Sequence, residues 1–301
     1  MQGTSRKLIG VIGSTGQQGG AVLRALQASG QFKLRALTRD PNKHRNLAEE
    51  VVAADLNRPE TLEAAFKGAH GVFLVTNFWE EGANELKQAT AAVRAAKDAD
   101  VKHFIWSTLP NVEAISHGKF HLPHFTGKAK IDQIVKEAGF ANHTFVIAPF
   151  YYQNLVGPLA PQKHVDGSVG WALPLDPTLR VIHMGDINEL GNIVAGAFAH
   201  PDEAGNGQYL PLVGDFMSFN EIVDTLNGQG HQFSFKQVPT EVFAASFPGA
   251  AEAAETFRYF EAYTYLGSDS YDRIALANQI AGQQPTRFSP WARMNFPAVE
   301  A

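Results

Sequence analysis

Short apolar runs alternate with segments of helical periodicity through the first half of the chain. The runs, each nearly all apolar, cover residues 8–12, 33–37, 50–53, 71–75, 103–107 and 144–148. Between the first two runs, Val22, Ala25 and Leu26 recur at the spacing of one helix face. Strands that are buried on both faces are typical of a parallel sheet covered by helices on both sides. The pattern therefore predicts a doubly wound α/β fold.

The alternation loosens after Phe150. Residues 157–170, GPLAPQKHVDGSVG, are punctuated by proline and glycine, which is typical of loops. We therefore expect residues 1–150 to form the parallel-sheet domain, and residues 151–301 to form a smaller α+β lobe that closes a cleft against it. A strand-like run and a helix-like run at about 180–200 are predicted to rejoin the first domain.

The composition narrows the possible functions. With 301 residues, of which 45% are hydrophobic and 18% charged, the chain has the make-up of a folded globule. It has no cysteine, which excludes disulfides, thiolate metal sites and a cysteine nucleophile. Its 25 basic residues are outnumbered by 30 acidic ones and form no basic block, so we expect no direct nucleic-acid binding. No apolar stretch approaches the length of a bilayer span, and MQGTSRK lacks the features of a signal peptide, so we expect a cytoplasmic protein without membrane contact.

Three glycines follow the first predicted strand and open the first predicted helix. Gly13, Gly16 and Gly19 have the spacing G-x-x-G-x-x-G. Such glycines allow a tight turn and a close approach of backbone to a pyrophosphate, while the helix N-terminus supplies free N–H groups. The pattern predicts a dinucleotide-binding turn of the Rossmann type, and the alternative is a close packing turn without a ligand. The residues between the glycines are Ser14, Thr15, Gln17 and Gln18.

Arg39 follows the second predicted strand, 20 residues after Gly19. An acid at this position holds the ribose 2′-hydroxyl of NAD, whereas an arginine can accept a 2′-phosphate. Lys43 stands four residues later, so both cations can meet one phosphate. We therefore predict NADP as the cofactor. The alternative is that both cations are solvated and that Asp40 sets the selectivity.

Polar residues stand at the ends of the later predicted strands, where ligands of open α/β sheets bind. Asp55 and Leu56 either contact an adenine edge or belong to a turn. Thr76 and Asn77 either line the ligand or close a turn. Ser107 either bonds to a substrate carbonyl or ends its strand. A further segment crosses the same edge after the sixth strand, either beside a nicotinamide or in the core, and comprises Pro149, Tyr151, Tyr152, Gln153 and Asn154.

The chain lacks the Tyr-x-x-x-Lys pair of a short-chain dehydrogenase, in which the phenol delivers the proton. None of its seven tyrosines is followed four residues later by a lysine. His124 and Lys128 have this spacing instead. Lys128 shares a helical stripe with Ile131 and Val135, so we predict that it points inward, toward the cofactor. His124 either donates a proton or packs, and a nearby lysine cation would lower its pKa.

His117, His121 and His124 are spaced H-x3-H-x2-H, a pattern that could attract a metal ion. Gly118 and Pro123 interrupt the helix that would align the three rings. No suitably spaced carboxylate joins them, so we predict no metal site.

Several motifs together resemble the NmrA-like family, an atypical branch of the short-chain dehydrogenases. They are GSTGQQGG, LTRDPNK, the pair Asp55–Leu56, VTNFWE at 75–80, HFTGK, PFYYQNL and the FPGA…FRYF stretch at 247–260. The likeness is greatest to the NADPH-sensing redox sensors of this family. It implies that residues 13–18 wrap the pyrophosphate and that Arg39 and Lys43 hold the 2′-phosphate. It implies further contacts from Asp55, Leu56, Thr76, Asn77, Phe78, Lys87, Lys128 and the segment from Tyr151 to Asn154.

The resemblance leaves two functions open. The first is a redox sensor that binds NADP(H), changes conformation with the state of the cofactor and passes this change to a regulatory protein partner. It requires unequal effects of the reduced and oxidised forms. The second is an NADPH-dependent reductase of a quinone or carbonyl substrate, with His124 or solvent supplying the proton.

Overall fold

A computed structural model describes residues 6–297 of the chain. Its main element is a seven-stranded sheet in the order β11-β6-β5-β4-β1-β2-β3. All of its strand pairs are parallel. The strands are β1 (Leu8–Ile12), β2 (Lys33–Thr38), β3 (Glu50–Ala53), β4 (Gly71–Leu74), β5 (His103–Thr108), β6 (Asn142–Ile147) and β11 (Asn206–Pro211). The order reverses between β1 and β4, where ligands of such sheets bind.

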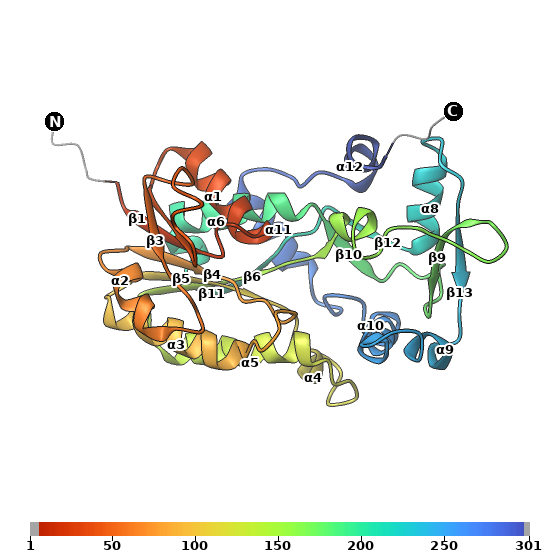
Figure 1. Cartoon of the computed structure of the whole chain (residues 1–301), viewed down its shortest axis with the longest axis horizontal. Helices are drawn as coiled ribbons and strands as arrows, with labels where there is room; N and C mark the ends of the chain where they lie inside the picture. Colours follow the sequence, from red (N-terminus) through yellow and green to blue (C-terminus); the bar gives the residue numbers. More distant parts are fainter. Residues whose placement is uncertain (1–5, 298–301) are drawn as a thin grey trace.

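Helices cover both faces of this sheet (Figure 1). One face is covered by α1 (Gln17–Ser29), α6 (Leu190–Ala199) and α11 (Tyr271–Ala281), whose apolar side chains share a core with β1 and β2. The other is covered by α2 (Leu62–Phe66), α3 (Glu85–Asp98) and α5 (Pro123–Glu137). The predicted doubly wound α/β fold is therefore confirmed. Two 3-10 turns accompany these helices, η1 (Pro59–Thr61) and η3 (Ile187–Glu189).

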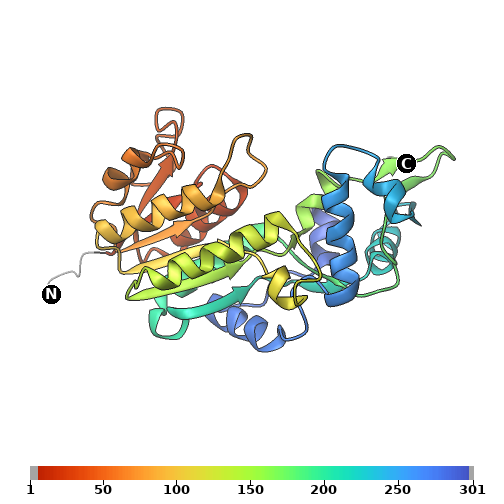
Figure 2. The same cartoon turned by 90° about the horizontal axis from the view of Figure 1, so that it is seen from below.

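A smaller lobe lies beyond the carboxyl ends of the strands (Figures 1 and 2). One of its sheets has the order β12-β10-β7 and the other β13-β9-β8. Its strands are β7 (Phe150–Tyr151), β8 (Gln162–Lys163), β9 (Val169–Leu173), β10 (Ile182–Gly185), β12 (Asp215–Met217) and β13 (Phe233–Gln237). Its helical segments are η2 (Tyr152–Val156), α8 (Phe219–Asn227), α9 (Thr240–Ala244), α10 (Ala250–Tyr263) and α12 (Phe288–Asn295). An aromatic-rich core joins these elements.

The two parts interleave along the sequence. In the stretch expected to rejoin the first domain, α6 packs on α1, whereas β10 pairs with β7 and β12 in the smaller lobe. From later in the chain, β11 adds an edge strand beside β6, and α11 packs beside α6. The boundary at residue 150 stays a prediction, and its outer ranges include residues 1–5 and 298–301, which lie outside the described chain. The remaining helices, α4 (Val112–Ile115) and α7 (Pro201–Ala204), are single turns.

No helix within residues 6–297 is long and apolar enough to cross a bilayer.

Candidate functional site

The glycine-rich turn joins β1 to α1 and can accept an anion. Gly13 has a φ of +70°, and a Cβ on residue 19 would lie 2.1 Å from the carbonyl oxygen of Gly13. Both positions therefore need glycine. The N-cap residue of α1 is Gly16, and no side chain caps the helix there. Free N–H groups and the helix dipole at this end suit a pyrophosphate. Ser14 fixes the turn to β2 by donating a hydrogen bond to the carbonyl of Leu37, at 2.9 Å.

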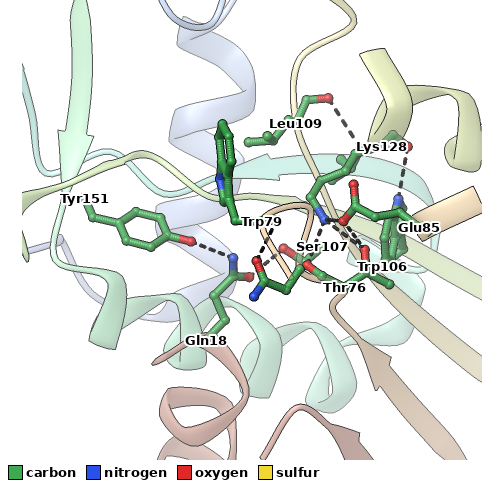
Figure 3. A network of polar contacts seen from close by, with 11 residues as sticks. Gln18, Thr76, Trp79, Glu85, Trp106, Ser107, Leu109, Lys128 and Tyr151 are labelled. Carbon is green, nitrogen blue, oxygen red and sulfur yellow. Dashed lines mark hydrogen bonds and ion pairs between the residues drawn. The ribbon is translucent and has the colours of Figure 1, made fainter. Parts of the chain in front are cut away.

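Gln18 links the two halves of the carboxyl edge, as Figure 3 shows. The Ser107 hydroxyl at the end of β5 donates to Gln18 Oε1 at 2.6 Å, and Gln18 Nε2 donates to the Tyr151 hydroxyl at 2.7 Å. Burial raises the pKa of Tyr151 to about 12, so the phenol is neutral at physiological pH. Because its oxygen accepts from Gln18, its own proton is free to bond to a ligand. These three side chains thus form one polar chain above the glycine turn.

Lys128 points inward and ends in a buried ion pair (Figure 3). Its Nζ lies 2.6 Å from Glu85 Oε1 and 3.0 Å from both the carbonyl and the hydroxyl oxygen of Thr76. The ammonium also lies 5.1 Å from the centre of the Trp106 ring. Desolvation lowers the pKa of Lys128, and the Glu85 carboxylate opposes this shift. Lys128 therefore reaches the end of β4, at the edge where a dinucleotide would lie.

His124 lies on the same helix as Lys128, one turn earlier, because α5 begins at Pro123. Its Nδ1 lies 2.5 Å from a carboxylate oxygen of Glu252, which is in the first turn of α10. The imidazole centre is 5.9 Å from that of Phe78 and 5.5 Å from that of Trp79. Burial lowers the pKa of His124, although Glu252 acts in the opposite direction. The neutral ring donates from Nδ1 to Glu252 and keeps Nε2 as an acceptor.

The other two histidines of the predicted cluster do not join His124. His121 Nδ1 contacts a Glu113 carboxylate oxygen at 3.1 Å, and His117 follows the short helix α4. Residues 6–297 contain no group of three or more His, Asp or Glu side chains placed to hold a metal ion.

The two cations predicted to bind a 2′-phosphate lie at the exposed end of β2, and each faces a carboxylate. Arg39 pairs with Glu80 from the loop between β4 and α3. Lys43 Nζ lies 3.5 Å from Asp40 Oδ2. Asp40 Oδ1 also accepts the Lys43 backbone N–H at 3.3 Å. Each of the two predicted cations is therefore already paired with a carboxylate of this chain.

Asp55 follows β3, and Lys87 lies on α3. Asp55 Oδ1 accepts the Asn57 N–H at 2.9 Å, a contact typical of the turn that the sequence offered as one alternative. Leu56 beside it is partly buried. Lys87 is exposed in the first turn of α3, where the Asn84 side chain accepts its N–H. It lines a groove of about 650 Å³ between α3 and η1. The structure does not bring Lys87 into the network around Lys128.

The segment after β6 turns mainly toward the smaller lobe. Tyr152 is fully buried, packs against Phe288 and Trp291, and donates to a backbone carbonyl, so its side chain belongs to the core. Gln153 Nε2 donates to Asp186 Oδ1 at 2.6 Å. Tyr151 alone in this segment joins the polar chain at the sheet edge. The flanking positions are Pro149, between β6 and β7, and Asn154, which is half-buried in η2.

Three carboxylates were missed by the sequence reasoning, and each contacts a predicted site residue. Glu85 pairs with Lys128, Glu80 with Arg39 and Glu252 with His124. Two of them, Glu85 and Glu252, lie in the first turn of a helix. Acidic residues at such places are common on solvent-exposed helices, so no local signal distinguished these.

Comparisons with known proteins agree with this architecture. A family model described as the NmrA-like family matches residues 5–290. An NmrA-like family domain-containing protein of Dictyostelium discoideum is 32% identical over 237 residues, which is 74% of this chain and 77% of that protein. The NmrA-like family domain-containing oxidoreductase FrzB of Cladobotryum is 32% identical, with 72% and 71% covered.

Two solved structures share the fold at low identity. NmrA, a negative transcriptional regulator solved in complex with NADP, has a TM-score of 0.78 and 19% identity, with 98% of this chain and 96% of that chain covered. The NADPH-dependent quinone oxidoreductase QOR2 of Escherichia coli, solved with NADPH, has a TM-score of 0.76 and 19% identity, with 96% and 99% covered.

Proposed function

The chain belongs to the NmrA-like family, and from this membership we propose that it binds NADP(H) and acts as a redox sensor for a regulatory protein partner. The uncapped N-terminus of α1 and the two glycines that cannot carry a Cβ suit the pyrophosphate. Arg39 and Lys43 would hold the 2′-phosphate. Gln18, Ser107, Thr76, Lys128 and Tyr151 would line the rest of the dinucleotide. A bound cofactor would supply or accept the hydride. A place in the cytoplasm stays a prediction.

The pairing of His124 with Glu252 carries the sensor proposal. It joins the sheet edge to α10 of the smaller lobe, and Phe78 and Trp79 pack on the same imidazole. Oxidised nicotinamide has a positive ring and reduced nicotinamide is neutral, so the two forms would act differently on this pair of titratable groups. A ligand shifts a conformational equilibrium only by its unequal interaction with the two states. The difference in charge between oxidised and reduced nicotinamide would make their interactions with the two conformations unequal.

Hydrogen exchange of the whole chain tests this proposal. With saturating NADPH or NADP+, we expect different protection in α10 and in residues 77–84. Glu252→Gln should reduce the difference in α10, whereas Glu255→Gln on the same helix, whose carboxylate bonds to Arg258, should leave it unchanged. Identical protection with the two cofactor forms would overturn the sensor function.

A second candidate is an NADPH-dependent reductase of a quinone or carbonyl. The observation that favours it is the position of His124, held by a carboxylate one helical turn from Lys128. Relatives such as FrzB are named oxidoreductases. A carboxylate that orients an imidazole also stabilises its protonated form, and this form would donate a proton to the substrate that receives the hydride of NADPH, leaving the neutral ring.

NADPH consumption against a panel of quinones and carbonyls, with His124→Phe alongside, tests the reductase. Saturable turnover that is lost in His124→Phe would support reduction with His124 in the chemistry. Turnover that survives the substitution would make His124 structural. Tight NADPH binding without turnover across the panel would count against the reductase and leave the sensor.

A further inference from the structure

We infer that Glu80 is a specificity-determining residue that lowers the preference of this site for NADP over NAD. The inference rests on the proposed binding of NADP(H). Arg39 is the residue that would select the 2′-phosphate, and the structure gives its guanidinium an internal partner in Glu80. A cation that is already paired is less available to a ligand.

The local backbone presents Glu80 to Arg39. Arg39 directly follows β2, and Glu80 lies in the loop after β4; both strands flank β1 in the sheet. The loop is folded by its own hydrogen bonds: the Glu80 N–H donates to the Asn77 carbonyl at 3.3 Å, and the Ala83 N–H donates to the Glu80 carbonyl at 3.0 Å. The Asn77 side chain accepts the Trp79 N–H at 3.1 Å. Glu80 is therefore held at the carboxyl edge, beside Arg39, which directly follows β2.

The charges around Arg39 make Glu80 a competitor of a 2′-phosphate for the arginine. Of the two cations predicted to hold a 2′-phosphate, the second, Lys43, already faces Asp40. A phosphate monoester carries a charge of about −1.5 to −2 at pH 7. To bind Arg39, the 2′-phosphate must displace Glu80 or share the guanidinium with it, and the Glu80 carboxylate repels the phosphate.

NAD meets no such conflict at this position. Its ribose has a neutral 2′-hydroxyl, which can donate a hydrogen bond to a carboxylate, as an acid does in NAD-selective folds. Glu80 can take this role from the loop after β4. One carboxylate therefore weakens NADP binding and supports NAD binding.

The size of the effect follows from the exposure of the pair. The Arg39 side chain is 67% exposed and that of Glu80 is 35% exposed. Exposed ion pairs contribute little. The weakening of NADP binding and the strengthening of NAD binding should therefore each change a dissociation constant by about two- to fivefold. Because the two effects act in opposite directions on NADP and NAD, the ratio of the two constants is the most sensitive quantity.

The test is calorimetric titration of the full chain and of Glu80→Gln with NADPH and NADH at low salt. We expect the ratio of the NADH to the NADPH dissociation constant to rise at least threefold in Glu80→Gln. Glu81→Gln is the matched control, because it removes the same charge from the next, exposed residue. In an Arg39→Ala background there is no arginine for Glu80→Gln to release. This contribution to tighter NADPH binding should therefore disappear.

An unchanged ratio in Glu80→Gln, or an equal rise in Glu81→Gln, would overturn the inference while leaving NADP(H) binding intact. Absence of binding of either dinucleotide to the unmodified chain would overturn the proposed function itself, and the inference with it.

Discussion

The buried ion pair between Lys128 and Glu85 gives the sharpest stability prediction. Their side chains are only 10% and 7% exposed, and Glu85→Gln would leave the ammonium without a counter-charge. Removing one partner of a buried pair costs about 3 to 5 kcal/mol. Thr76 still offers Nζ two oxygens, so we expect the lower end, about 3 kcal/mol, or roughly 5 to 10 °C in Tm.

The stability loss caused by Glu85→Gln should depend on pH in one direction. Desolvation lowers the pKa of Lys128, and Glu85 opposes it, so Glu85→Gln lowers this pKa further. A lysine whose pKa is depressed in the fold destabilises the protein while it is charged, and the cost disappears as the pH rises. The stability deficit of Glu85→Gln should therefore shrink as the pH rises toward the ordinary lysine pKa of about 10.4.

Thermal and urea unfolding, followed by circular dichroism, measure these effects. The exposed Glu81→Gln should stay within about 0.5 kcal/mol of the unmodified protein. Adding Lys128→Met to Glu85→Gln should restore most of the loss, since it removes the unpaired charge. A cost of less than about 1 kcal/mol for Glu85→Gln, or a double variant no more stable than the single one, would contradict an unpaired buried charge on Lys128.

Three further predictions concern other parts of the chain. Asp132 is buried, and its pKa is raised to about 6. The folded protein should therefore lose stability as the pH rises from about 4 to 6. In urea unfolding, Asp132→Asn should remove about 2 to 3 kcal/mol of this pH dependence. Gly19→Ala puts a Cβ 2.1 Å from the Gly13 carbonyl oxygen and should weaken NADPH binding at least about tenfold in a titration, whereas Gly127→Ala, with open space around it, should not. Trp79 is 69% exposed while the other three tryptophans are buried, so Trp79→Phe should remove nearly all acrylamide quenching of the fluorescence; quenching that persists would place a different tryptophan at the surface.

The sequence predicted the sheet well because buried parallel strands are continuous apolar runs. All six predicted strands are present, with ends that differ by at most two residues. The edge strand β11 was missed because its sequence, NGQYLP, is polar in its first half and fully buried only at Leu210 and Pro211. Such a strand is defined by its pairing with β6 and not by its own pattern.

The arrangement of the candidate site residues was predictable where the signals are local, and it was missed where it depends on the tertiary fold. The glycine turn and the inward direction of Lys128 follow from spacing within one turn or one helix. The partners of Lys128 and His124 are 43 and 128 residues away in sequence. Only the fold brings Glu85 and Glu252 to them, and a first-turn glutamate has the same sequence signature whether it is solvated or buried.

Equilibrium titration of the purified chain with NADPH and NADP+, with Gly19→Ala as the control, is the decisive test of a cofactor site at the glycine turn. We predict saturable binding of both forms at one site per chain, with unequal affinities, and a large loss of binding in Gly19→Ala. No saturable binding, or binding that Gly19→Ala leaves unchanged, would contradict a cofactor site at the glycine turn and with it the proposed function.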